Sequence, residues 1–177
     1  MNNLQKRLAL VGAALALQIF PVLSTAAYAY YPFVRPLFQI SQSKEIPQLK
    51  YYRLDTSNCK DCVDWLNKQS ARPATLSNEE FEQMKSVLQK SITRHNLKNQ
   101  GNNNFQISGH YGVQYLPYID KEGKKQIWIN GFCVNDELYQ KPKTEIIEAF
   151  DGGSCFFNAL IRSGTKKSVP ISIHGFA

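Results

Sequence analysis

The sequence lacks the motifs that identify many enzymes and nucleotide-binding proteins. It has no glycine-rich phosphate-binding loop and no GxSxG element, and Ser154 in "DGGSC" follows a glycine pair that is typical of a tight turn. No pair among its 14 acidic residues stands out as catalytic carboxylates. We therefore expect a non-catalytic binding or interaction domain that needs no cofactor.

Long apolar runs are absent after the first 29 residues. The run "LALVGAALALQIFPVL" is 16 residues long, which is short for a spanning helix, and it follows Lys6 and Arg7. Ala27 and Ala29 then form a small-x-small cleavage site, so residues 1–29 are predicted to be a secretory signal peptide. The alternative is an uncleaved N-terminal anchor, because aromatic residues continue beyond the cleavage site. After cleavage we expect a periplasmic or secreted protein that does not span the membrane.

Excess charge of one sign is small in the mature chain. Loss of Lys6 and Arg7 with the signal peptide takes the formal net charge from +7 to +5. No basic stripe is interleaved with stacking aromatic residues, as nucleic-acid binding requires. We expect no nucleic-acid partner, and an unidentified protein or small ligand of the cell envelope instead.

Cysteine is scarce, and the four cysteines all lie in the mature part: Cys59, Cys62, Cys133 and Cys155. An even number in an exported chain predicts two disulfide bonds, for which three connectivities exist. Alternation within "KKQIWINGFCV" and "SCFFNALIRS" places each cysteine on a defined strand face, so neighbouring strands would bring Cys133 and Cys155 together. Cys59 and Cys62 would then form a local pair.

The segment "NCKDC" permits two other interpretations. A thiol-disulfide enzyme would use Cys59 as nucleophile and Cys62 as resolving thiol at a helix N-terminus, where Ser57 or Asn58 offers an N-cap. We keep this as the alternative function, although an antiparallel strand order would not provide the βαβ unit of such enzymes. A zinc site would add a histidine, but a lone histidine is more often a structural polar group, so no metal site is predicted.

The remaining chain predicts a single α+β domain over residues 47–177, preceded by an extended leader over residues 30–46. "LSNEEFEQMKSVLQKSITRHNL" predicts one long helix that starts at a capping box of Ser77 and Glu80. Strand-like segments follow it, with a hairpin turn at "DKEG". The predicted fold is one long helix packed on a four- to five-stranded antiparallel meander, a cystatin-like layout.

Aromatic residues concentrate in the strand region. If one helix covers one face of the sheet, the other face is left to present an aromatic groove. The candidate binding residues are Tyr115, Tyr118, Trp128 and Phe132. This count of faces is the basis of the binding hypothesis.

The stretches "HYGVQYLPYIDKEGKKQIWINGFC", "DGGSCFFNALI" and "IHGFA" resemble a family of small exported bacterial proteins. These proteins share QYxxY, WINxFC, DGGxCxF and C-terminal NGxA-like motifs. The resemblance covers most of residues 77–177 and implies export, an α+β fold and pairing of Cys133 with Cys155, but it implies no activity. The chain departs from the pattern at His174, where the family tends to have asparagine, and "NCKDC" lies upstream of the shared region.

Overall fold

The computed structural model describes residues 46–134, 141–148 and 152–174. All of them belong to one compact unit of the chain. The expected signal peptide, residues 1–29, and nearly all of the expected leader, residues 30–46, lie outside the described residues. Neither helix in this described part combines the length and the apolar character that a bilayer span requires.

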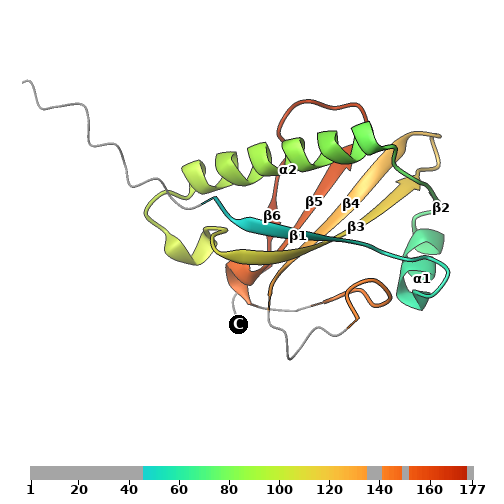
Figure 1. The fold of residues 1–177 in the computed structure, drawn as a ribbon, viewed down its shortest axis with the longest axis horizontal. Coiled ribbons are helices and arrows are strands. Elements are labelled where there is room, and N and C mark those ends of the chain that lie inside the picture. Colours follow the sequence, from blue (N-terminus) through green and yellow to red (C-terminus); the bar gives the residue numbers. More distant parts are fainter. Residues whose placement is uncertain (1–45, 135–140, 149–151, 175–177) are drawn as a thin grey trace, which may run out of the picture. The chain divides into compact units, whose positions relative to one another are not determined.

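The described chain is an α+β domain with two helices and one mixed sheet (Figure 1). Along the sheet the strand order is β1-β3-β4-β5-β6, and β2 pairs with the last residues of β3. The helices are α1 (Lys60–Lys68) and α2 (Asn78–Lys98). The strands are β1 (Gln48–Arg53), β2 (Arg72–Pro73), β3 (His110–Ile119), β4 (Lys125–Cys133), β5 (Phe156–Arg162) and β6 (Ser172–Ile173).

The α+β class is confirmed, but the predicted layout of one long helix on an antiparallel meander is wrong. The sheet carries two helices, and β1 pairs with β3 in parallel, with Gln48 opposite His110 and Arg53 opposite Tyr115. Only the pairs from β3 to β6 and the pair of β2 with β3 are antiparallel. Parallel neighbours need a crossover connection, and α2 provides it, since a helix of 21 residues is about 30 Å long. The helix returns the chain to the end of the sheet at which β1 began.

The start of α2 confirms the predicted capping box. The backbone N–H of Glu80 donates to Ser77 Oγ at 3.2 Å, and the backbone N–H of Ser77 donates to Glu80 Oε2 at 2.9 Å. Each side chain thus satisfies a backbone group that the first helical turn leaves unpaired. The local sequence is sufficient to fix this end of the helix.

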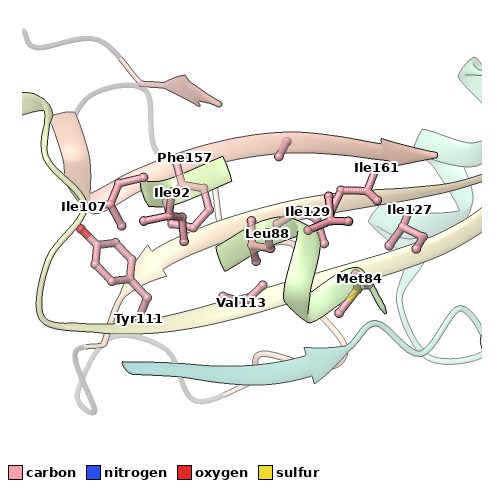
Figure 2. Packing of buried hydrophobic residues seen from close by; sticks show 12 residues of the cluster. Met84, Leu88, Ile92, Ile107, Tyr111, Val113, Ile127, Ile129, Phe157 and Ile161 are labelled. Atoms are coloured by element: carbon pink, nitrogen blue, oxygen red, sulfur yellow. The ribbon is translucent and has the colours of Figure 1, made fainter. Parts of the chain in front are cut away.

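The main core lies between α2 and one face of the sheet (Figure 2). Met84, Leu88 and Ile92 follow at helical spacing and are fully buried. They meet the odd-numbered residues of the strands, such as Val113 and Ile129. Burial of each large aliphatic side chain contributes roughly 1.5–3 kcal/mol, so this layer accounts for much of the driving force for folding.

A disulfide bond joins the end of β4 to the start of β5. Cys133 and Cys155 are bonded, with their Cα atoms 4.8 Å apart, and Cys155 lies in a short 3-10 turn directly before β5. The alternation of β4 and β5 places Ile127 opposite Ile161 and Ile129 opposite Ala159 on the face that α2 covers. The disulfide bond between Cys133 and Cys155 is the one that the alternation of these strands predicted.

Candidate binding groove on the second face of the sheet

The second face of the sheet carries the even-numbered residues of β3, β4 and β5. Antiparallel register aligns these residues into rows that cross the three strands. One row consists of amide side chains and the next row of apolar side chains. The two rows are Gln114–Asn130–Asn158 and Leu116–Trp128–Leu160.

Helix α1 places a second tryptophan against the apolar row. The ring of Trp65 lies 5.6 Å from that of Trp128 and 5.2 Å from that of Tyr118, measured between centroids. The contact with Tyr118 is edge-to-face, a favoured geometry for aromatic pairs. Both tryptophans of the chain are therefore in one cluster, and both are half-buried.

A hollow of about 420 Å³ opens beside this cluster. Trp128 and Leu160 form part of its lining, and the side chain of Leu160 is 50 % exposed. A second hollow of about 350 Å³ shares Trp128 and Asn158 with the first, so the two adjoin. We name them together the tryptophan groove. Its further lining residues are Trp65, Gln69, Tyr118, Asn130, Ile146, Ile147, Glu148, Ala159, Pro170, Ser172 and His174.

The amide row crosses the sheet as a chain of hydrogen bonds. Asn130 Nδ2 donates to Gln114 Oε1 at 2.9 Å, and Asn158 Nδ2 donates to Asn130 Oδ1 at 2.9 Å. Asn158 Oδ1 in turn lies 2.7 Å from His174 Nε2. Because a carbonyl oxygen accepts, this contact places a proton on Nε2 of His174.

The same amides hold the segment 141–148 over the sheet. Gln114 Nε2 donates to the carbonyl oxygens of Pro142 at 2.9 Å and Glu145 at 2.6 Å. The backbone of Ile147 closes the network, since its N–H donates to Gln114 Oε1 and its carbonyl accepts from Asn130 Nδ2. The hydrogen-bonding capacity of Gln114 is thus used internally, and the amide row builds a wall of the groove rather than ligand-binding groups.

The two cysteines of the "NCKDC" segment pack in the same hydrophobic cluster as Trp65 and Trp128. Cys59 and Cys62 are bonded, and Cys59 itself, not Ser57 or Asn58, is the N-cap of α1, where its sulfur accepts from the backbone N–H of Cys62 at 3.2 Å. Both cysteines are buried, at 1 % and 0 % exposure, in a cluster that Trp65 packs against. The disulfide therefore fixes the first turn of the helix that carries Trp65.

The position of this disulfide bears on the thiol-exchange interpretation in two opposing ways. In favour of it, the order β1, α1, β2, α2, β3 with parallel β1 and β3 provides a helical crossover between parallel strands, which the predicted antiparallel meander lacked. Exchange, however, requires a thiolate to reach a disulfide sulfur, and neither sulfur is accessible in the folded chain. Accessibility, rather than topology, is the stronger objection.

The four predicted binding residues do not share one surface. Tyr118 and Trp128 line the groove. Tyr115 lies on the opposite face, where its ring is 5.4 Å from that of Phe81 of α2. Phe132 is on the groove face but only 2 % exposed, because its ring packs over Gly112 and beside Tyr52.

The phenol of Tyr118 keeps its proton at neutral pH. Burial raises the pKa of the Tyr118 phenol, and the carboxylate of Asp120 raises it further. Tyr118 is therefore a neutral hydrogen-bonding group in the groove wall. Within residues 46–134, 141–148 and 152–174, no three histidine, cysteine or acidic side chains gather as a metal site would require.

The residues that sequence reasoning missed are Trp65, Leu160 and His174. Leu160 was detectable, because it shares the parity of Phe156 on the outward face of β5. Trp65 and His174 reach the groove through α1 and the chain after β6, and no local pattern indicates either contact. Comparisons of the chain with protein-family models, with curated proteins and with solved structures found no match.

Proposed function

We propose that the chain is an exported, non-catalytic binding domain that holds a small ligand with a flat apolar face in the tryptophan groove. The observation that carries this proposal is the convergence of both tryptophans on one ligand-sized hollow, on the sheet face that α2 leaves uncovered. Ligand pockets commonly have volumes of about 300–1,000 Å³. Export is supported by the N-terminal sequence and by the two disulfide bonds.

The lining of the groove indicates the kind of ligand. The indole rings and Leu160 offer flat apolar contact, while the amide of Gln69 and the hydroxyl of Ser172 are exposed at the rim. A planar or pyranose ring with polar substituents at its edge matches this combination of a flat apolar wall and peripheral hydrogen-bonding groups. The buried amides of Gln114 and Asn130 in the neighbouring row contribute shape rather than recognition, because they already bond each other and the segment 141–148.

The hydrogen bonding of the groove supports binding rather than catalysis, because His174 Nε2 lies 2.7 Å from Asn158 Oδ1 and is thus held by the amide row. Burial and the carboxylate of Asp120 raise the pKa of Tyr118, away from neutrality. General acid–base catalysis works best when the pKa of the catalytic group lies near the operating pH. The groove is thus suited to hold a ligand without transforming it.

The tryptophans provide a direct test of binding. In a ¹⁵N-labelled sample only two indole N–H signals exist, and both report on the groove. We expect that members of a library of small aromatic and sugar-ring compounds shift these signals, and that Leu160→Ser weakens binding without unfolding, because Leu160 is half-exposed.

Tyr115→Phe, on the opposite face, is the matched control and should bind like the wild type. The proposal is wrong if no compound moves either indole signal. It is also wrong if Leu160→Ser and Trp128→Ala both leave the affinities unchanged.

Thiol-disulfide exchange is the second candidate, and the observation in its favour is the CxxC disulfide at the first turn of α1, after a strand. Thiol-disulfide exchange is tested by measuring insulin reduction by the wild-type full chain and by the Cys59→Ser variant. We expect no turnover with either protein, because the disulfide is buried. Turnover that Cys59→Ser abolishes would establish exchange and replace the binding proposal as the main activity.

A further inference from the structure

Acidic residues are absent from two long stretches of the chain, residues 83–119 and 152–174. The three acids of α2, Glu79, Glu80 and Glu82, lie in its first two turns. All charged side chains of the helix beyond this point are basic or histidine. These two stretches pack together in the fold, so the charge of the domain is strongly asymmetric.

Three basic residues form a stripe along α2. Lys90, Arg94 and Lys98 are spaced four residues apart, which places them on one side of the helix, and all three are exposed. The segment between β5 and β6 runs beside them, since Arg94 Nη1 donates to Ser168 Oγ at 3.2 Å. This contact brings in Lys166 and Lys167, which are also exposed. We name these five residues the cationic face.

Fold stability does not explain the cationic face. Like charges four residues apart destabilise a helix, and the helix dipole favours cations only in the last turn, which accounts for Lys98 alone. The ion pairs found in the described part of the chain use Lys85, Lys121, Lys125 and Lys141, and none uses a residue of the cationic face. The charge is therefore available to an external anion.

A hollow at the end of the stripe has the size and chemistry for a phosphate group. It measures about 210 Å³ and lies between α2 and residues 169–171. Arg94 and Lys98 form its cationic side, with the imidazole of His95 between them in the sequence, and Val169 and Ile171 form its apolar side. Phosphate oxygens are bound by this combination of a guanidinium fork and an ammonium group.

Leu97 stands among these cations with its side chain 66 % exposed. It is seven residues after Lys90 and three after Arg94, so it is on the same side of the helix. An exposed leucine is ordinary when isolated. Among cations on one helix side, however, it is typical of helices that lie in a membrane interface, where the apolar group enters the acyl boundary.

We propose that the cationic face lies on an anionic phospholipid surface, with a headgroup phosphate in the hollow of Arg94, His95 and Lys98 and with Leu97 in the acyl boundary. Single-stranded nucleic acid fits less well, because its binding sites stack bases on aromatic side chains and no residue of this face is aromatic. This inference is independent of the proposed ligand. Helix α2, which carries the stripe, covers one face of the sheet (Figure 1), whereas the indole rings of the tryptophan groove lie on the other face. The two hollows share Pro170, in the segment between β5 and β6, but no other lining residue.

The test is flotation of the full chain with phosphatidylcholine vesicles that contain or lack phosphatidylglycerol. Each basic residue near an anionic surface strengthens binding roughly five-fold, so the triple variant Lys90→Gln, Arg94→Gln and Lys98→Gln should lose roughly a hundred-fold in affinity for the anionic vesicles. Leu97→Ala should weaken binding to the same vesicles, and moderate salt should do so as well.

The matched control is Lys60→Gln, Lys68→Gln and Lys121→Gln, which removes the same charge from exposed positions elsewhere. It should bind like the wild type, while circular dichroism checks that each variant is folded. The apolar N-terminal run is identical in all proteins, so it cannot produce a difference between them. Equal binding of both triple variants would overturn the proposal, and so would binding of a DNA oligonucleotide that is tighter than binding of the anionic vesicles.

Discussion

Lys125 Nζ lies 2.8 Å from Glu80 Oε1, and this ion pair joins the first turn of α2 to the first residue of β4. The same carboxylate accepts from Ser163 Oγ at 2.8 Å, directly after β5. Glu80 therefore caps its own helix and ties that helix to two strands. The contacts also explain why a charged residue is only partly exposed at this position.

Glu80 should make the fold sensitive to acid. The hydrogen bond from Lys125, together with those from Ser77 and Ser163, lowers the pKa of Glu80 from 4.5 to about 2. A carboxyl group whose pKa is lowered by folding stabilises the fold fully above its unfolded pKa, and this contribution is lost as the pH falls from about 4.5 toward 2. We expect Glu80→Gln to reduce the free energy of unfolding by about 1 kcal/mol at neutral pH. Urea unfolding of Glu80→Gln and of the control Glu82→Gln, at several pH values, measures the effect; equal stabilities would contradict it.

Gln114 should be the side chain on which the segment 141–148 depends. In Gln114→Leu the buried N–H of Ile147 loses its acceptor and the part-buried carbonyls of Pro142 and Glu145 lose their donor. A buried unsatisfied group costs about 1–3 kcal/mol. We expect a loss of at least about 2 kcal/mol and rapid hydrogen exchange at Ile147. Asn158→Ala is the comparison, because Asn158 belongs to the same amide row but makes no hydrogen bond to the segment 141–148. Unchanged exchange at Ile147 would mean that other contacts hold the segment.

Gly131 should not tolerate a side chain. It pairs with Phe157 across β4 and β5, and a Cβ atom at this position would collide with the phenyl ring of Phe157 in the main core. Gly131→Ala should destabilise the fold by roughly 2 kcal/mol through overpacking. The double variant Gly131→Ala with Phe157→Leu replaces the obstructing ring with a smaller side chain. Its thermal unfolding midpoint should lie closer to that of Phe157→Leu alone than the midpoint of Gly131→Ala lies to the wild type. If stability is not recovered, the destabilisation by Gly131→Ala arises from the backbone and not from a clash with Phe157.

The two disulfides should differ in their contribution to stability. Cys133 and Cys155 are 22 residues apart, a loop length for which the bond contributes about 3 kcal/mol, whereas Cys59 and Cys62 are only three apart. Replacing the first pair with alanine should lower the denaturation midpoint more than replacing the second pair. The second replacement should mainly alter tryptophan fluorescence, because α1 positions Trp65. The opposite ranking of the two midpoints would refute this account.

Local signals predicted α2 and the β3–β4 hairpin well. The capping box of Ser77 and Glu80 needs only neighbouring residues, and Gly123 adopts the positive φ that the turn requires, at 78°. Asp120 Oδ1 also accepts from the N–H of Lys124 at 2.8 Å within that turn. The direction of β1 was not predictable in this way, because it depends on where the far end of a long helix delivers the chain.

Side-chain alternation along β3 separates two of the four predicted binding residues. Tyr115 and Tyr118 are three positions apart in one strand, so their side chains must point to opposite faces. The sequence therefore contained the evidence that the four predicted binding residues do not form one surface. Burial of Phe132 was not predictable, because its ring packs over Gly112, beside Tyr52 and in one cluster with Ile147, and these contacts come from three separate segments.

The parallel pairing of β1 with β3 also constrains the order of folding. β1 has no strand partner until β3 has been synthesised, more than 50 residues later. Contacts between residues so far apart in sequence form slowly, because the intervening loop must first be ordered. A chain that emerges from the ribosome in this order stays open until the β3–β4 hairpin is present.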